Sequence, residues 1–565
     1  MKMQNQWNTI HWKECEQMLA ENQNNLVIAT KRGDHKEIKR IQYKIIRMFA
    51  TRALAVRKIT SSKGKRTPGV DNEKWLRSEQ KMEAVMRLKN LSNYKPLPVK
   101  RVWLPKPGKT EKRPLGIPTL FDRAVQALFL YALEPVVETS ADSRSFGFRK
   151  ARSVHDAAEY IRLMCASKYG KRYVLKVHIR KFFHTINQQW LLENTPMETR
   201  TLRKLLEVLD LDHFTPGEQE QEQEQEQEQE QGVSQEGVLS PCLINHSLDG
   251  LEKALSLKLN VFLVRYADDF VITGDSPEQL EEAKKRVERF LATRGLSVND
   301  EKTSITSVEQ GFDFLGFHFR EYPDKGRVTG VKKGIFLVKP SKKNITNIIS
   351  KISGIIRAYP NAEAGTLIKE LNPILRGWAE HYRTVSSRSA FRKVSEHTFR
   401  SLLRWVYRKH SRVKRRETLR KYFITKKTKN SVNNWVFSGF NERKQPLTLF
   451  QIGETTFKKH IMISLKQPKN PFLLEDATYF FKRSKSLILH TVLYDLRKKK
   501  VMLKQDGMCG WCERPMETGD QIQLHHKTPF KDGGKDNLGN LMAIHSECHK
   551  QLTYSMRAKK KGGSA

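Results

Sequence analysis

The chain has 565 residues, which is enough for several domains that each bury a core of their own. It carries 103 Lys and Arg residues against 61 Asp and Glu residues, which gives a formal net charge of +42. The excess is spread along the chain, so whole domain faces must be positive. A polyanion such as nucleic acid is therefore the simplest partner, with a membrane surface as the alternative.

Other composition features exclude several classes of protein. No stretch approaches ~18 consecutive apolar residues, so no spanning helix is expected. Residues 1–16 are polar and carry early acids, unlike a secretory or transit peptide. Six cysteines argue against a disulfide framework. We expect a soluble intracellular protein from a bacterial cytoplasm or an organelle, and the Lys, Asn and Ile content favours a plastid over a mitochondrion.

In chain order, a basic helical pattern over residues 7–62 comes first and ends in a turn at 66–71. Lys106 and Arg113 then flank a Pro-Gly turn that follows a strand-like segment. Two cations on a β-hairpin are suited to holding a triphosphate, although as isolated residues they would read as plain surface charges. Residues 122–138 predict a buried helix.

An acidic pair dominates the middle of the chain. Asp268 and Asp269 stand between the apolar residues 261–264 and 271–272, which predicts a strand, a tight turn and a second strand with both acids at the tip. Mg²⁺ prefers rigid oxygen ligands, and phosphoryl transfer commonly uses two such ions roughly 4 Å apart. The pattern favours polymerase-type palm chemistry; the alternative is an exposed Asp-Asp turn. Residues 218–231 upstream are seven Glu-Gln pairs with no apolar face.

The C-terminal part is basic and ends in a Cys/His pattern. Residues 342–410 are helical in pattern, and a basic linker-like region follows. Cys509 with Cys512 forms a C-x₂-C pair, and His545 with Cys548 forms an H-x₂-C pair about thirty residues later. Four ligands at this spacing predict a closed structural Zn²⁺ site that folds a small module. The alternative is a redox or incidental cysteine pair.

Taken in order, these motifs resemble a known set. Residues 145–149, 152–157, the acidic hairpin, 295–303 and 314–316 are similar to the successive reverse-transcriptase blocks of group II intron-encoded proteins, the intron maturases. Arg376-Gly377-Trp378 with His381-Tyr382 resembles the maturase thumb, or domain X, and the C-terminal module resembles an HNH endonuclease. The resemblance covers nearly the whole chain.

The resemblance implies a multidomain α+β fold. Its parts would be right-hand polymerase fingers and palm, an α-helical thumb, and a zinc-stapled ββα-metal module. It also implies binding of the host intron RNA and of a double-stranded DNA target. The expected segments are 1–95 for an N-terminal helical RNA-binding extension and the start of the fingers, 96–335 for fingers and palm, 340–440 for the thumb, 441–500 for a basic DNA-binding linker, 501–555 for the HNH module and 556–565 for a basic tail.

Site residues follow from the same resemblance. His526 would be the general base that activates water, and His525, Asn540 and His549 would hold a catalytic Mg²⁺ or other divalent ion. Thr553 stands where many members have a further histidine. The expected nucleotide-binding residues are Lys106, Arg113, Phe183 and Gln235. The expected RNA-binding residues are Arg376, Trp378 and Tyr382 of the domain X motif. To these the residues themselves add Arg404, Trp405 and Arg408, from the run 404–410 in which aromatic side chains alternate with cations.

The polymerase blocks depart from the family at the points that matter for catalysis. Within the apolar frame of residues 177–184, His178 and His184 replace the family's two aspartates, and His178 takes the metal-ligand position. An imidazole is a poor Mg²⁺ ligand and adds no negative charge. Glu236 stands where the nucleotide-gripping turn has a glycine. We predict a splicing maturase that has lost polymerase activity and kept the nuclease; the alternatives are a fully active mobile reverse transcriptase and a nucleic-acid-binding relic.

Overall fold

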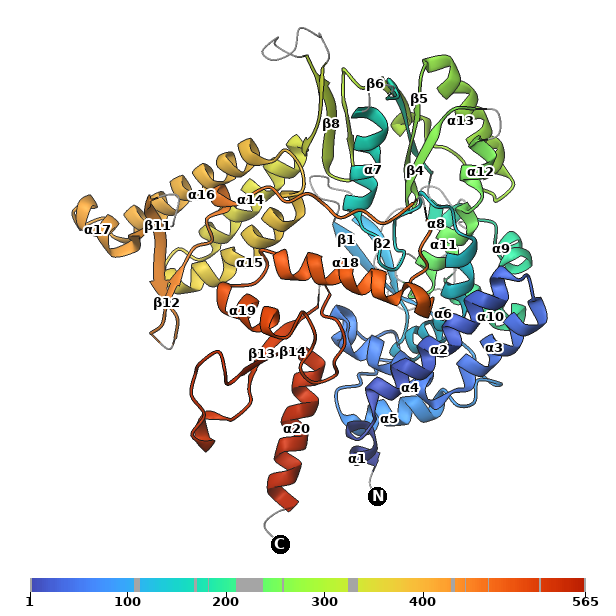
Figure 1. Ribbon diagram of the computed structural model, residues 1–565, viewed down its shortest axis with the longest axis horizontal. Coiled ribbons are helices and arrows are strands. Elements are labelled where there is room, and N and C mark those ends of the chain that lie inside the picture. Colours follow the sequence, from blue (N-terminus) through green and yellow to red (C-terminus); the bar gives the residue numbers. More distant parts are fainter. Residues whose placement is uncertain are drawn as a thin grey trace, which may run out of the picture.

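The computed structural model describes residues 3–105, 112–166, 170–180, 182–209, 237–256, 259–323, 334–427, 432–442, 444–465, 467–517 and 520–562. The Glu-Gln segment at 218–231 lies outside these residues. Within them the chain forms a mixed α/β structure, coloured from blue to red along the sequence in Figure 1. No helix in this part of the chain has the length and apolar character needed to cross a lipid bilayer.

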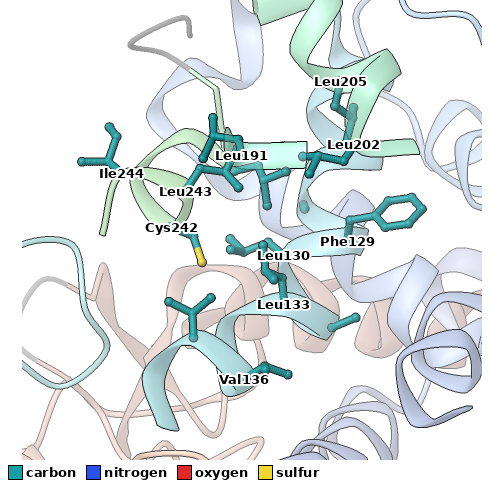
Figure 2. Close-up of a cluster of buried hydrophobic side chains, with 14 of the residues drawn as sticks. Phe129, Leu130, Leu133, Val136, Leu191, Leu202, Leu205, Cys242, Leu243 and Ile244 are labelled. Atoms are coloured by element: carbon teal, nitrogen blue, oxygen red, sulfur yellow. The ribbon is translucent and has the colours of Figure 1, made fainter. Parts of the chain in front are cut away.

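Helices build the N-terminal part around one long central helix, α6. The elements are α1 (Met3–Asn8), α2 (Trp12–Lys31), α3 (His35–Arg47), α4 (Phe49–Ser61), α5 (Ser78–Arg87), the hairpin β1 (Lys100–Pro105) and β2 (Lys112–Ile117), and α6 (Leu120–Ser140). Helix α6 is buried on nearly all sides, as expected for a helix that is apolar all round. Its side chains meet those of α10 (Thr199–Leu209) and α11 (Ser240–Leu248) in the core cluster of Figure 2. The Thr119 side chain caps its start by accepting from the Asp122 backbone N–H.

A four-stranded antiparallel sheet lies at the centre, and we call it the central sheet. Its strands are β3 (Tyr173–His178), β4 (Phe262–Tyr266), β5 (Asp269–Gly274) and β6 (Ser304–Ser307), in the order β4-β5-β3-β6. Residues alternate between its faces, so Leu263 and Ile272 join the core of the N-terminal helices, whereas Val264 and Val271 join a second core. Both faces are therefore buried, which explains the apolar runs beside the acidic pair. The surrounding helices are α7 (Val154–Ala166), α8 (Phe182–Thr185), α9 (Gln188–Asn194), α12 (Leu251–Ser256) and α13 (Pro277–Ala292).

The second core continues into a helical lobe, which we define as residues 342–454. Its elements are α14 (Lys342–Ala358), α15 (Ala364–Tyr382), α16 (Arg388–Lys409), α17 (Arg415–Tyr422), β10 (Phe423–Lys427), β11 (Val432–Phe440), β12 (Pro446–Thr448) and a 3₁₀ turn at Ile452–Glu454. The sheet β7 (Phe312–Phe314), β8 (Phe317–Tyr322) and β9 (Ile335–Pro340) connects the lobe to α7. Strand β12 pairs with β11, so this part of the chain runs past the boundary expected at residue 440.

The last segment crosses the molecule and ends in a small separate core. Helix α18 (Ala477–His490) runs between the helical lobe and the N-terminal helices (Figure 1). It is followed by α19 (Leu496–Lys504), β13 (Ile522–His526), β14 (Leu541–His545) and α20 (Ser546–Gly562). We call residues 496–562 the Cys/His module, because its core contains Cys509, Cys512 and Cys548.

Candidate functional sites

The acidic hairpin has the predicted shape. Strands β4 and β5 pair from Phe262↔Thr273 to Tyr266↔Asp269, and Ala267 and Asp268 form the turn between them. Ala267 has a φ of +57°, which such a tight turn requires. Gly147 packs so closely on this turn that a Cβ atom there would lie 2.4 Å from the Ala267 nitrogen. The Ser145–Arg149 motif is therefore a support for the hairpin, and its glycine is needed for the close approach.

A buried polar network fixes the hairpin from behind. Arg265 is fully buried and donates to the Asp249 carboxylate and, at 3.3 Å, to the side-chain oxygen of Asn245. The Asn245 amide in turn donates to the Gly147 carbonyl at 2.8 Å. Burial raises the pKa of Asp249 to about 6, and the Arg265 charge partly offsets this effect. Because buried charges must be paired, this network gives the hairpin a single position.

His178 occupies the place expected of a third metal-binding carboxylate. In the sheet His178 lies directly across from Asp269, and its Nδ1 donates to the Asp269 carboxylate at 2.8 Å. Burial raises the pKa of Asp268, the Asp269 charge raises it further, and His178 opposes both effects. The site thus has two carboxylates, one of them bonded to an imidazole.

Several predicted nucleotide-binding residues lie outside the described part. Lys106, Gln235 and Glu236 are outside the described residues, as are the side chains of Arg113 and Phe183. The backbone of Arg113 belongs to β2 and faces Leu104 across the predicted hairpin. The neighbouring Phe182 is buried in the core of the N-terminal helices. The nucleotide-gripping roles therefore stay predictions.

The expected RNA-binding residues of the helical lobe divide into two groups. Arg404 and Arg408 are exposed on α16, as an RNA contact requires. Trp405 is 2% exposed and its indole N–H donates to the Tyr359 carbonyl. Tyr382 is 3% exposed and its hydroxyl donates to the Gly316 carbonyl. These two aromatic residues pack the lobe and do not face solvent, which corrects the expectation.

Arg376 and Trp378 are also engaged within the protein. The Arg376 guanidinium donates to the carbonyls of Val492 and Tyr494 and lies 4.6 Å from the centre of the Phe450 ring. Trp378 packs against Tyr382, with ring centres 4.7 Å apart. Arg376 therefore joins α15 to the segment that leads into the Cys/His module. In a helical sequence pattern, an aromatic or cationic residue can either pack inside the protein or face solvent. Arg376 and Trp378 make contacts inside the protein.

Four predicted zinc ligands meet in the Cys/His module. The ligand atoms of Cys509, Cys512, His545 and Cys548 all lie within 4.8 Å of one another. The Cys512 sulfur is 3.4 Å from His545 Nδ1. This is close to the separation of about 3.5–3.8 Å expected between two ligand atoms of one tetrahedral Zn²⁺ ion. His545 Nε2 lies 3.2 Å from the Asp520 carboxylate, which fixes the ring with Nδ1 towards the sulfurs. Three thiolates and one imidazole with this geometry fit zinc.

The predicted catalytic histidines lie on either side of β13. His525 is 9% exposed and packs against His549 of α20, with ring centres 5.1 Å apart. Burial lowers the pKa of both residues, so each imidazole is neutral and able to bind a metal at neutral pH. Thr553, one turn further along α20, donates to the His549 carbonyl instead of adding a ligand. Two imidazoles could hold a divalent ion whose other ligands come from water and a phosphate.

His526 points to the other face and has an acidic partner. Its Nε2 lies 3.0 Å from the Asp536 carboxylate, which is also bonded by Arg497 of α19. A carboxylate bonded to one ring nitrogen orients the imidazole and leaves the other nitrogen as the base. Sequence reasoning missed Asp536 and Arg497, since neither belongs to a spacing motif.

Asn540 has a different role from the one expected. Its side-chain oxygen accepts from the Thr528 N–H at 2.8 Å, and its amide donates to the carbonyls of Thr528 and Lys535, each at 2.9 Å. These bonds close the loop between β13 and β14. Asn540 therefore positions the loop that carries Asp536, and its role as a metal ligand stays a prediction.

A buried ion pair, unforeseen in the sequence, connects the crossing segment to helix α7. Arg483 of α18 donates through Nη2 to both oxygens of Asp156 of α7, at 2.7 and 2.9 Å, and His460 Nε2 lies 3.0 Å from the same carboxylate. Burial alone would raise the pKa of Asp156, but the bond from His460 and the charge of Arg483 lower it well below its ordinary value. Residues 441–500, which were expected to form a linker, are thus attached to the protein core through His460 and Arg483.

The contact between α7 and α15 predicts that the folded protein is less stable in acid. His155 of α7 donates to the His381 carbonyl of α15 at 2.7 Å. Burial lowers the pKa of His381 to about 4, and the nearby His155 adds to the effect. The unfolded chain then binds more protons than the folded chain between about pH 6.5 and pH 4. The contribution of His381 to the free energy of unfolding is therefore complete above pH 6.5 and is lost as the pH falls towards 4.

We expect this histidine to reduce the free energy of unfolding by about 2 kcal/mol between pH 7.5 and pH 5. The measurement is urea unfolding at both pH values for the unmodified chain and for His381→Gln. The variant should show the smaller pH dependence. Equal pH dependence in the two chains would show that His381 is not buried as a neutral group.

Comparisons with known proteins agree with the order of these parts. Family profiles match for the N-terminal domain of reverse transcriptase over residues 7–88 and for reverse transcriptase (RNA-dependent DNA polymerase) over 104–319. They match the group II intron maturase-specific domain over 345–423 and HNH endonuclease over 509–555.

Several curated proteins are similar to this chain in sequence. Protein YkfC of Escherichia coli is 32% identical over 47% of this chain and 78% of its own length. Maturase-like protein 1 of Euglena gracilis is 26% identical over 67% and 78%, and the group II intron-encoded protein LtrA of Lactococcus lactis is 26% identical over 47% and 54%. A telomerase of Candida albicans solved with a telomeric RNA fragment aligns over 57% of this chain and 63% of that chain, at 12% identity and a TM-score of 0.28, which is too low to define the fold.

The profiles appear in the order that the motifs predicted, and the Cys/His cluster lies inside the HNH match. The relatives include proteins named as maturases and as group II intron-encoded. The chain therefore belongs to the group II intron maturases that combine a reverse-transcriptase domain with a C-terminal HNH endonuclease domain.

Proposed function

We propose that this maturase binds its intron RNA to promote splicing, that its polymerase site no longer extends primers, and that its HNH module cleaves double-stranded DNA. In this reading the N-terminal helices and the central sheet are polymerase fingers and palm, and the helical lobe is the thumb. The compartment would be one that contains the host intron, a bacterial cytoplasm or an organelle. The preference for a plastid stays a prediction.

The loss of polymerase activity rests on the bond between His178 and Asp269. Two Mg²⁺ ions bring four positive charges, and carboxylates normally offset them. Here the third position holds an imidazole that donates its Nδ1 hydrogen to Asp269 and occupies one of its oxygens. Binding Mg²⁺ would require breaking this bond, and the site would still carry one negative charge fewer than with an aspartate.

Primer extension on an RNA template tests this part of the proposal. We expect no cDNA from the unmodified chain with Mg²⁺ or Mn²⁺. We also expect His178→Asp to remain near that level, because Glu236 and the Glu-Gln segment are still present. Adding Glu236→Gly and deleting residues 218–231 should be needed for extension. Clear cDNA from the unmodified chain, abolished by Asp268→Ala, would show instead a fully active mobile reverse transcriptase.

The nuclease assignment rests on the placement of three histidines around β13. His525 and His549 would hold a divalent ion, which when bound would stabilise negative charge on a scissile phosphate. His526, oriented by Asp536 at 3.0 Å, would take the proton from the attacking water. The zinc cluster holds β14 and α20 together and so keeps His549 beside His525. A module that merely binds DNA would not need His526.

A further inference from the structure

The helical lobe contains a hollow of about 620 Å³ that none of the predicted sites includes. Its walls come from α16, from β10 and β11, and from residues 449–453. Pockets of ~300–1,000 Å³ commonly bind small ligands. On α16 the residues Arg388, Arg392, Ser395 and Phe399 follow one another at three- and four-residue spacing, so they share the face that lines the hollow.

An aromatic platform lies in this hollow. Trp435 of β11 is 51% exposed, although its ring centre lies 5.9 Å from Phe399 and 6.2 Å from Phe423. Both contacts are edge-to-face, so the indole is held in place while half of its surface remains open. A planar ligand that stacks on the indole would cover it.

The wall beside the platform is polar and fixed. The Asn433 amide donates to the Gln451 side chain at 3.1 Å and to Glu454 at 3.3 Å, and its oxygen accepts from the Trp435 backbone N–H at 3.0 Å. The Gln451 amide donates to the Leu449 carbonyl at 2.9 Å. The side chains next to Trp435 are therefore preorganised, which reduces the entropy lost when a ligand binds.

The rim carries positive charge. Arg388 and Arg392 are exposed one turn apart, and neither makes an ion pair among the described residues. Glu396, the acid at this rim, is paired with Arg400. Two free guanidinium groups above an aromatic floor match the phosphate and the base of one nucleotide. Arg404 and Arg408 extend the positive charge along the same helix.

We propose that this hollow binds one unpaired nucleotide of the intron RNA, with its base stacked on Trp435 and its phosphate held by Arg388 and Arg392. The proposal rests on the RNA-binding function and adds a base-sized subsite to it. RNA is favoured over DNA because the α16 wall lies inside the match to the maturase-specific domain, whereas the DNA-cleaving module is a separate part of the chain.

Fluorescence anisotropy with the full chain tests the subsite. The probes are a short labelled RNA stem with one bulged adenosine, the same stem with an abasic bulge, the fully paired stem, and a DNA stem with the same bulge. We expect the bulged RNA to bind about tenfold more tightly than the abasic and paired stems, since stacking on an aromatic side chain contributes about 1–3 kcal/mol per base. Bulged DNA should show a smaller preference.

The variants separate stacking from charge. Trp435→Ala should abolish the preference for the bulged RNA, and Trp435→Phe should retain most of it. Phe440→Ala is the matched control, since Phe440 is an aromatic residue of the same strand, is 62% exposed and does not line the hollow. The double variant Arg388→Gln with Arg392→Gln should weaken all probes and lower the salt dependence by about one phosphate contact. Lys393→Ala, on the same helix but outside the hollow, controls for charge loss.

Equal affinity for the bulged and abasic RNA stems, or an undiminished preference in Trp435→Ala, would overturn the subsite and leave RNA binding intact. An equal preference for bulged DNA would overturn the assignment to RNA. Failure to bind any RNA probe would remove the RNA-binding function together with the subsite.

Discussion

Cys548→Ser is expected to remove zinc from the chain and to unfold the Cys/His module. Cys548 lies at the start of α20 and is 1% exposed, so its thiolate is the link between that helix and the Cys509–Cys512 turn. Structural zinc contributes an apparent ~10–16 kcal/mol to the folding of small zinc modules, which have little core of their own. The loss of one thiolate should therefore melt β13, β14 and α20 while the central sheet remains folded.

Zinc content per chain and hydrogen exchange of residues 520–562 measure this effect. The control is Cys15→Ser, which changes a buried cysteine outside the cluster and should keep one zinc per chain. If Cys548→Ser retains zinc and the module remains protected from exchange, the four residues do not form a structural zinc site. The redox alternative would instead predict a disulfide between Cys509 and Cys512 in the isolated protein.

His526→Ala is expected to reduce nicking of supercoiled plasmid by about 10²–10⁴-fold, the usual contribution of a general base. The variant should keep its zinc, because His526 faces away from the cluster and bonds to Asp536. Plasmid nicking with Mg²⁺ or Mn²⁺, quantified at equal protein concentration, is the measurement. A variant that nicks as fast as the unmodified chain would rule out His526 as the base.

Two further variants refine this result. His525→Ala should raise the divalent-ion concentration needed for half-maximal nicking, because it removes one of two neighbouring imidazoles. His11→Ala changes a histidine that is 78% exposed in the N-terminal helices and should leave nicking unchanged. If the unmodified chain never nicks DNA, the module is a zinc-stabilised DNA-binding remnant.

The sequence predicted features that depend on local spacing. Asp268 and Asp269 lie between two apolar runs, so strand, turn and strand were predictable. The apolar frame around His178 indicated that it belongs to the same site, whereas its pairing with Asp269 across the sheet is seen only in the structure. The four zinc ligands were predictable for the same reason, since both pairs keep a two-residue spacing that suits tetrahedral binding.

Features that depend on contacts between distant segments were not predictable. Asp156 and Arg483 are 327 residues apart, and nothing in either neighbourhood indicates a partner. Trp405 alternates with cations in the sequence and Tyr382 belongs to the motif that resembles domain X, so both were expected to contact RNA, but their positions on α16 and α15 turn them into the core. Asn540 fits a metal-ligand motif, and only the loop geometry shows that the backbone uses its amide.

The measurement that most directly tests the account is in vitro splicing of the host intron RNA with and without the protein at matched salt. We predict that the protein accelerates splicing, and that Asp268→Ala accelerates it equally, because splicing depends on RNA binding and not on the palm carboxylates. Splicing at the same rate with and without the protein would contradict the maturase function. A loss of splicing in Asp268→Ala would contradict the claim that the palm site is no longer used.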